Sequence, residues 1–169
     1  MEQDMTDMVA LEPGTYRGFT GYINYDGIEG YVENADFILV GGYDRYMHGL
    51  AKMIWNRGTW RNGRCGLVEW LDGTWLDGTF ESGSWLGGTW KNGVFNLSTF
   101  YAGTWNGGTF FWSIWIHGTW NGGVFRKSEW HDGVWNGGVF EESAISPNGS
   151  ITMPTANETG GVLTERMWH

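Results

Sequence analysis

The pattern of hydrophobic and polar positions between residues 55 and 140 is a five-residue repeat with one large aromatic side chain in each unit. Counting in fives from Trp55 gives eighteen positions, of which seventeen are aromatic and one is Cys65. The position two residues earlier, from residue 58 onward, is Gly thirteen times, Ser three times and Val once. The unit therefore reads Gly-Thr-Trp-x-x. The central positions are Trp55, Trp60, Cys65, Trp70, Trp75, Phe80, Trp85, Trp90, Phe95, Phe100, Trp105, Phe110, Trp115, Trp120, Phe125, Trp130, Trp135 and Phe140.

A period of five residues fits neither a helix, which repeats its buried face about every 3.6 residues, nor a flat strand, which repeats it about every 2. It fits a short strand followed by a corner. Gly at the start of each unit permits corner dihedral angles and a close approach of the neighbouring chain. Thr or Val before the aromatic residue favours the extended state. The repeat therefore predicts an all-β chain wound into a β-solenoid.

The aromatic side chains are expected to point into the solenoid. If they pointed outward, their immediate neighbours would be buried, and these include Arg61, Lys91 and Arg126. Burying unpaired charges is far too costly. The small residue two positions before the ring then also points inward, where Gly or Ser leaves room for it.

A longer period of fifteen residues groups the units in threes. The first unit of a group carries Trp, as at Trp105, the second Phe, as at Phe110, and the third mostly Trp, as at Trp115. The simplest interpretation is a three-sided coil of fifteen residues, in which like residues stack about 4.8 Å apart. Six such coils give a rod roughly 29 Å long. A four-sided coil of twenty residues is the alternative, and an antiparallel meander of short hairpins is a third possibility.

The repeat resembles that of the pentapeptide-repeat proteins, which also place a small residue two positions before a central inward Leu or Phe. Ser98-Thr99-Phe100 and Gly108-Thr109-Phe110 carry this resemblance. It implies a four-sided, right-handed coil, whereas the fifteen-residue period favours three sides. Runs such as Gly103-Thr104-Trp105-Asn106-Gly107-Gly108 are also similar to repeat stretches in structural proteins of tailed bacteriophages.

The two ends of the chain lack the five-residue period. Residues 1–54 contain apolar stretches at 22–25 and 37–40, and are expected to form irregular strands that cap the first coil, with Leu50 as the first in-register residue. Residues 55–140 form the solenoid. Residues 141–169 are rich in Ser, Thr, Asn and Gly and are expected to be an extended tail along the rod or on a partner, or disordered, with Trp168 as a candidate anchor.

The charge distribution bears on the class of partner. The net charge of −9 argues against binding to nucleic acid or to an anionic membrane. Residues 55–140 carry six acids and six bases, so the excess lies in the two ends. The pentapeptide-repeat resemblance implies a DNA-mimicking, topoisomerase-binding protein as one alternative, but a neutral rod is a poor mimic of the phosphate backbone.

The sequence also bears on location. No signal peptide and no apolar stretch long enough to enter a membrane is apparent, so we expect synthesis in a cytoplasm and possible incorporation into a virion. The single Cys65 excludes an internal disulfide.

Chemistry has little support in the sequence. No nucleotide loop, zinc pattern or nucleophile motif is present, and we expect no catalytic residues, no metal and no cofactor. His117 stacks on Asp132 in the fifteen-residue register, where a surface pair is expected in preference to an acid–base pair or half of a metal site. The sequence therefore predicts that the protein is not an enzyme.

Binding has more support, because apolar side chains recur at outward positions. After the third aromatic of each coil come Leu71, Leu86, Tyr101 and Ile116, which should stack into one stripe. The outward positions of the second face add Leu67, Leu97, Phe111 and Trp112. Such a patch indicates an interface with a second copy or with another structural protein, unless the tail or the N-terminal segment covers it.

These features predict a structural or adhesive scaffold that is a component of a virion or a similar assembly. Carbohydrate or ice binding is a further alternative. Phe111 and Trp112 could stack on a sugar, and Thr59, Thr74 and Thr89 begin a threonine ladder on the first face. The neighbouring column begins Arg61, Leu76, Lys91, which spoils a regular ice-binding array, so the ladder is expected to be structural.

Overall fold

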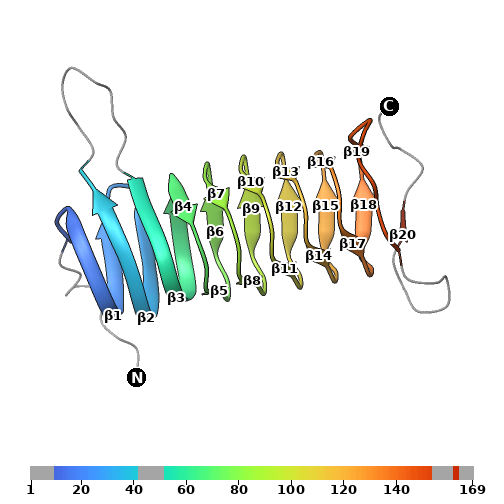
Figure 1. Ribbon diagram of the computed structural model, residues 1–169. Coiled ribbons are helices and arrows are strands. Elements are labelled where there is room, and N and C mark those ends of the chain that lie inside the picture. Colours follow the sequence, from blue (N-terminus) through green and yellow to red (C-terminus); the bar gives the residue numbers. More distant parts are fainter. Residues whose placement is uncertain (1–9, 42–51, 154–161, 164–169) are drawn as a thin grey trace, which may run out of the picture.

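The structure is a computed structural model that describes residues 10–41, 52–153 and 162–163, and it is built entirely from strands over those residues (Figure 1). At the N-terminal end lie β1 (Gly14–Tyr25), β2 (Ile28–Val40) and β3 (Lys52–Gly66). The first face of the solenoid continues with β5 (Thr74–Trp75), β8 (Thr89–Trp90), β11 (Thr104–Trp105), β14 (Thr119–Trp120) and β17 (Val134–Trp135). The second face has β6 (Thr79–Glu81), β9 (Val94–Asn96), β12 (Thr109–Phe111), β15 (Val124–Arg126) and β18 (Val139–Glu141). The third has β4 (Val68–Trp70), β7 (Ser84–Trp85), β10 (Thr99–Phe100), β13 (Ile114–Trp115), β16 (Glu129–Trp130) and β19 (Ala144–Ile145).

The coils stack in parallel with a constant offset of fifteen residues. Trp60 pairs with Trp75, and Trp105 pairs with Trp120 on the same face. Figure 1 shows the coils as successive rungs along one axis. The prediction of an all-β, three-sided solenoid with fifteen residues per coil is confirmed, and the four-sided coil and the hairpin meander do not describe the repeat.

The predicted inward rings fill the interior. All seventeen aromatic side chains of the repeat are buried, none more than 2% exposed. Rings of one face stack nearly parallel from coil to coil, as Trp60 and Trp75 do at 5.0 Å and 2°. Rings of neighbouring faces meet edge to face, as Trp70 and Trp75 do at 5.9 Å and 72°. Both geometries are favourable for aromatic pairs, which is how two Trp and one Phe fit in most coils.

The small inward residues differ between the faces. On the first face, Gly73 has φ +125°, and a Cβ there would overlap the carbonyl oxygen of Gly58 in the preceding coil, so only glycine fits. On the third face, serine replaces glycine in the later coils. The hydroxyl of Ser113 donates to the carbonyl of Phe111 (2.8 Å) and accepts the backbone N–H of Ser98 (3.1 Å). Serine therefore supplies a hydrogen bond between coils at this corner.

The corner between the second and third faces has a left-handed backbone conformation that its residue types do not predict. In each coil its φ lies between 47° and 58°, yet none of the residues is glycine. Left-handed conformation costs an ordinary residue about 1 kcal/mol. The corner residues are Leu67, Ser82, Leu97, Trp112, Lys127 and Glu142.

The N-terminal end is an antiparallel hairpin wound onto the first coil. β1 pairs with β2, and β2 pairs with β3, which in turn pairs in parallel with β4, β5 and β6. The register slips between Glu33 and Asp36 and again between Asp36 and Phe37, so that the long strand can follow the triangular outline. The two predicted apolar stretches lie in β1 and β2. The predicted boundary between residues 54 and 55 lies within β3, so the cap and the first coil share one strand.

The C-terminal residues continue the winding. β19 pairs with β16, Thr152 forms a bridge with Val134, and β20 (Val162–Leu163) pairs with β18. The described part of the predicted tail therefore adds a further, looser coil over the end of the rod. Leu50 and Trp168 lie outside the described residues.

Candidate interaction face

The third face presents three outward columns that flank its strands. Along the chain, inward and outward side chains alternate, so Ser113 and Trp115 are buried while Ile114 lies outside between Trp112 and Ile116. The fifteen-residue register repeats this row in every coil. We call the outward side chains of the columns that begin at Leu67, Glu69 and Leu71 the third-face surface.

Exposed apolar side chains concentrate on this surface. Among the described residues nine large hydrophobic side chains are exposed, and six of them belong to the third-face surface. The other three, Val40, Val94 and Met153, lie elsewhere. Single exposed hydrophobic residues are ordinary, but a cluster of them marks an interaction site. The six are Leu71, Leu86, Leu97, Tyr101, Trp112 and Ile114, with exposures from 36% to 56%.

The structure brings together the two groups that the sequence separates. Leu71, Leu86, Tyr101 and Ile116 form one edge column of the surface, each fifteen residues after the last. Leu67, Leu97 and Trp112 were expected on the second face, but the left-handed corner places them at the opposite edge of the third. Of the predicted partner-binding set, only Phe111 stays on the second face, where its ring meets that of Trp112 at 5.8 Å.

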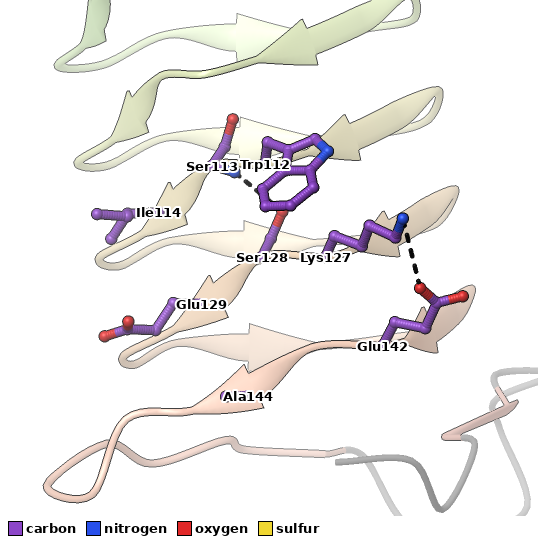
Figure 2. Close-up of a pocket in the computed structure, with 8 residues that line it drawn as sticks. All are labelled: Trp112, Ser113, Ile114, Lys127, Ser128, Glu129, Glu142 and Ala144. Atoms are coloured by element: carbon purple, nitrogen blue, oxygen red, sulfur yellow. Dashed lines mark hydrogen bonds and ion pairs between the residues drawn. The ribbon is translucent and has the colours of Figure 1, made fainter. Parts of the chain in front are cut away.

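Sequence reasoning missed Ile114, which lies in the centre of this surface and is 40% exposed. The signal was available in the sequence, because Ile114 occupies the outward position of the unit Ser113-Ile114-Trp115. The neighbouring third-face units carry the polar residues Thr99 and Glu129 at that position. Figure 2 shows Ile114 and Trp112 on the two sides of Ser113.

A shallow hollow of about 490 Å³ lies at the C-terminal end of the apolar cluster. Trp112 and Ile114 form its apolar side, and Lys127, Glu129 and Glu142 form the charged side (Figure 2). The Lys127 ammonium lies 5.6 Å from the centre of the Trp112 ring and 3.8 Å from Glu142. This cation–π contact restrains the Trp112 indole, which remains 55% exposed.

The charges that border the surface are paired with one another. Lys52 bonds to Glu69 at 2.8 Å at one end, and His131 contacts Glu129 at 2.6 Å at the other. Together with the Lys127–Glu142 pair, these contacts give Glu69, Glu129 and Glu142 each a partner among the described residues.

The predicted His117–Asp132 pair is present and exposed, with His117 Nδ1 3.2 Å from Asp132 Oδ2. The Ser150 hydroxyl also donates to Asp132, and this bond, the Gly133 N–H and His117 hold the pKa of Asp132 below its usual value. Asp132 is therefore the centre of the cluster, and neither Ser150 nor His117 is arranged to activate the other. No group of three metal-ligating side chains occurs among the described residues.

The buried Cys65 offers no nucleophile either, because burial raises the pKa of its thiol well above the ordinary value. The threonine ladder of the first face is present in β5, β8, β11 and β14, and the asparagines beside it bond to each other: Asn121 donates to Asn106 at 2.9 Å and Asn136 donates to Asn121 at 2.8 Å. These amides therefore bond to one another along the column.

Comparison with known proteins adds no relative: no family model, no curated protein and no solved structure matches the chain. In the part of the chain that the structure describes, no helix has the length and apolar character needed to cross a bilayer.

Proposed function

We propose that this protein is a non-enzymatic structural protein, a stiff β-solenoid scaffold that docks through its third-face surface onto a second copy of itself within a larger assembly. The observation that carries the proposal is that, of the nine large hydrophobic side chains exposed among the described residues, six lie on one face of a prism whose other outward columns are mostly polar.

The core supports a role as a spacer or scaffold. Columns of rings in contact along the whole rod resist bending, because a bend would separate close-packed faces on one side. The core is nearly uniform from coil to coil, so the outward surface is the feature that varies along the rod.

The charge of the solenoid supports self-association over nucleic-acid mimicry. Its six acids and six bases balance, so two rods do not repel one another strongly. Arg57 and Arg61 are already paired with Asp36 and Glu33 of the cap. No described feature favours the DNA-mimicking, topoisomerase-binding alternative over docking.

The size of the surface supports an assembly over an isolated pair. Four coils by about five residues cover ~16 Å by ~19 Å, or ~300 Å², at the usual strand rise and spacing. A stable one-to-one interface buries ~800 Å² on each partner. A single contact of this size therefore binds weakly. Many such contacts in one assembly bind strongly, because each contact holds the others in place. A virion is one such assembly, and the phage-like repeat runs are the reason to name it.

The test is the oligomeric state at high protein concentration. We expect sedimentation equilibrium of the wild-type chain to show concentration-dependent self-association, and the Leu86→Asp/Ile116→Asp double variant to remain monomeric at the same melting temperature. Leu76→Asp, a half-buried leucine on the first face, is the matched control and should associate like the wild type.

Two results would contradict the proposal. One is a wild-type chain that is monomeric at millimolar concentration, and the other is a double variant that associates unchanged. Purification of a particle that contains the chain in stoichiometric amount would support the virion setting.

A further inference from the structure

A second candidate site lies at the N-terminal end of the molecule, on the outer side of β1, β2 and β3. The strand register aligns Tyr22 with Tyr31, and Tyr31 with Asn62. The next outward row along the strands aligns Asn24, Glu29 and Arg64. Between the rows, Ile23, Gly30 and Gly63 take the inward position. Three strands thus present a two-by-three array of polar and aromatic side chains.

The two tyrosines form an aromatic corner that is open to solvent on one side. Their ring centres are 5.0 Å apart at an angle of 69°, and both side chains are only half-buried. The hydroxyls of Tyr16 and Tyr25 donate to backbone carbonyls, whereas those of Tyr22 and Tyr31 have no partner among the described residues. These two rings therefore do not anchor the fold through their hydroxyls.

The polar side chains around the rings also keep their hydrogen-bonding capacity. Asn24, Glu29 and Asn62 have no side-chain partner among the described residues. Arg64 is held in place by two hydrogen bonds to Glu81, at 2.7 and 3.1 Å. The array therefore offers two amides, each with donor and acceptor, one carboxylate acceptor and one fixed guanidinium.

These side chains line a hollow of about 680 Å³ with Gly30 and Gly63 at its floor. The floor is firmly supported, since a Cβ on Gly30 would overlap the Trp60 ring beneath it. The volume lies in the range of sites for small organic ligands, about 300–1,000 Å³. Recognition elements on paired strands over a close-packed core are pre-organised.

We infer that this hollow binds a neutral oligosaccharide. A pyranose ring has an apolar C–H face that packs on aromatic rings, and a rim of hydroxyls that need both donors and acceptors. The tyrosine corner offers aromatic rings for the C–H face, and Asn24, Glu29 and Asn62 offer donors and acceptors for the hydroxyls. Arg64 is neutralised by Glu81, and Glu29 repels anions, so phosphates and acidic sugars are disfavoured. The inference is independent of docking through the third-face surface.

The test uses the full chain and defined sugars. A printed array of neutral glycans is screened first, with cellohexaose, maltohexaose and chitohexaose then titrated in solution by calorimetry. We expect at least one neutral oligosaccharide to bind, and Tyr22→Ala or Tyr31→Ala to weaken it about tenfold or more. Tyr22→Phe, which keeps the ring, should stay within about fivefold of the wild type.

Tyr101→Ala is the matched control, because it removes an exposed tyrosine from the third-face surface. It should bind the sugar like the wild type. The inference is overturned if no neutral glycan binds, if only polyanionic glycans bind, or if binding survives both tyrosine-to-alanine substitutions. Melting temperatures of all variants separate loss of the site from loss of the fold.

Discussion

The first and third faces of the solenoid share one inward plan and differ in what they present to solvent. Both bury a column of aromatic rings beside a column of small residues. Outside, the first face repeats Thr from Thr59 to Thr119, and the column beside these threonines ends in three asparagines whose amides bond to one another. The third face carries Leu, Tyr, Ile and Trp with no fixed repeat. The interior therefore dictates the inward residues, and the outward ones are free to serve binding.

The substitution with the largest expected effect removes an inward tryptophan, and it is compared with the removal of an outward one. Trp120→Ala deletes a buried ring that stacks on Trp105 and Trp135 at 4.9 and 5.1 Å, and it leaves the Gly137 carbonyl without its indole donor. We expect a loss of ~3–5 kcal/mol in the free energy of unfolding, measured with urea. Trp112→Ala on the third-face surface should cost less than ~1 kcal/mol. Equal losses would mean that the inward and outward roles are not distinct.

A smaller effect is expected from the serine column that distinguishes the third face. Ser113→Ala removes the bond to the Phe111 carbonyl and leaves the buried N–H of Ser98 unpaired. The expected loss is ~1–3 kcal/mol in thermal or chemical unfolding. Ser84→Ala, an outward serine in β7, is the control and should change stability by less than ~0.5 kcal/mol. If Ser113→Ala leaves the unfolding free energy unchanged, the serine hydroxyls do not stabilise the fold.

The left-handed corner predicts a substitution that stabilises the fold while weakening docking. Leu97 has φ 50°, so Leu97→Gly relieves backbone strain and should raise the unfolding free energy by ~0.5–1 kcal/mol, although it removes an exposed leucine. Leu86→Gly, at an outward position without positive φ, should lower it by a similar ~0.5–1 kcal/mol. Both should reduce self-association. The same sign for both stability changes would refute the corner explanation.

The smallest expected effect is a pH dependence at the corner between the third and first faces. The pKa of Asp132 is lowered by the Ser150 hydroxyl, the Gly133 N–H and His117, so ionised Asp132 favours the folded state. This contribution is present above the pKa of the unfolded carboxyl, near 4, and is lost as pH falls through the lower folded value. Asp132→Asn should make the melting temperature less dependent on pH below about 4. An unchanged pH profile would exclude this contribution.

The sequence was sufficient for the coil because a strict period constrains every unit at once. One ring and one small residue in five, repeated over residues 55–140, leave few ways to bury the aromatics. The non-repetitive features were harder. The corner at Leu97 and Trp112 has φ values that usually require glycine, so nothing in the residue types points to it, and the apolar groups on its two sides were assigned to separate faces.

The tyrosine hollow could not be predicted for a different reason. Its rows join residues such as Asn24, Glu29 and Arg64, and their alignment depends on the pairing of three antiparallel strands with several bulges. A slip of one residue would turn every side chain to the other surface. Apolar periodicity fixes register in the repeat, but here register follows from how the hairpin wraps the first coil.

The stacked ring columns give the core a spectroscopic property as well as a structural one. Neighbouring indoles such as Trp90 and Trp105 lie 4.7 Å apart within 5° of parallel, close enough for their electronic transitions to couple. Excitation of one buried indole is therefore shared with its neighbours in the column. The near-ultraviolet circular dichroism signal should report whether the coils are stacked. Trp112 lies outside the stacks and is exposed, so burial of its indole by a partner should shift the tryptophan emission to shorter wavelength.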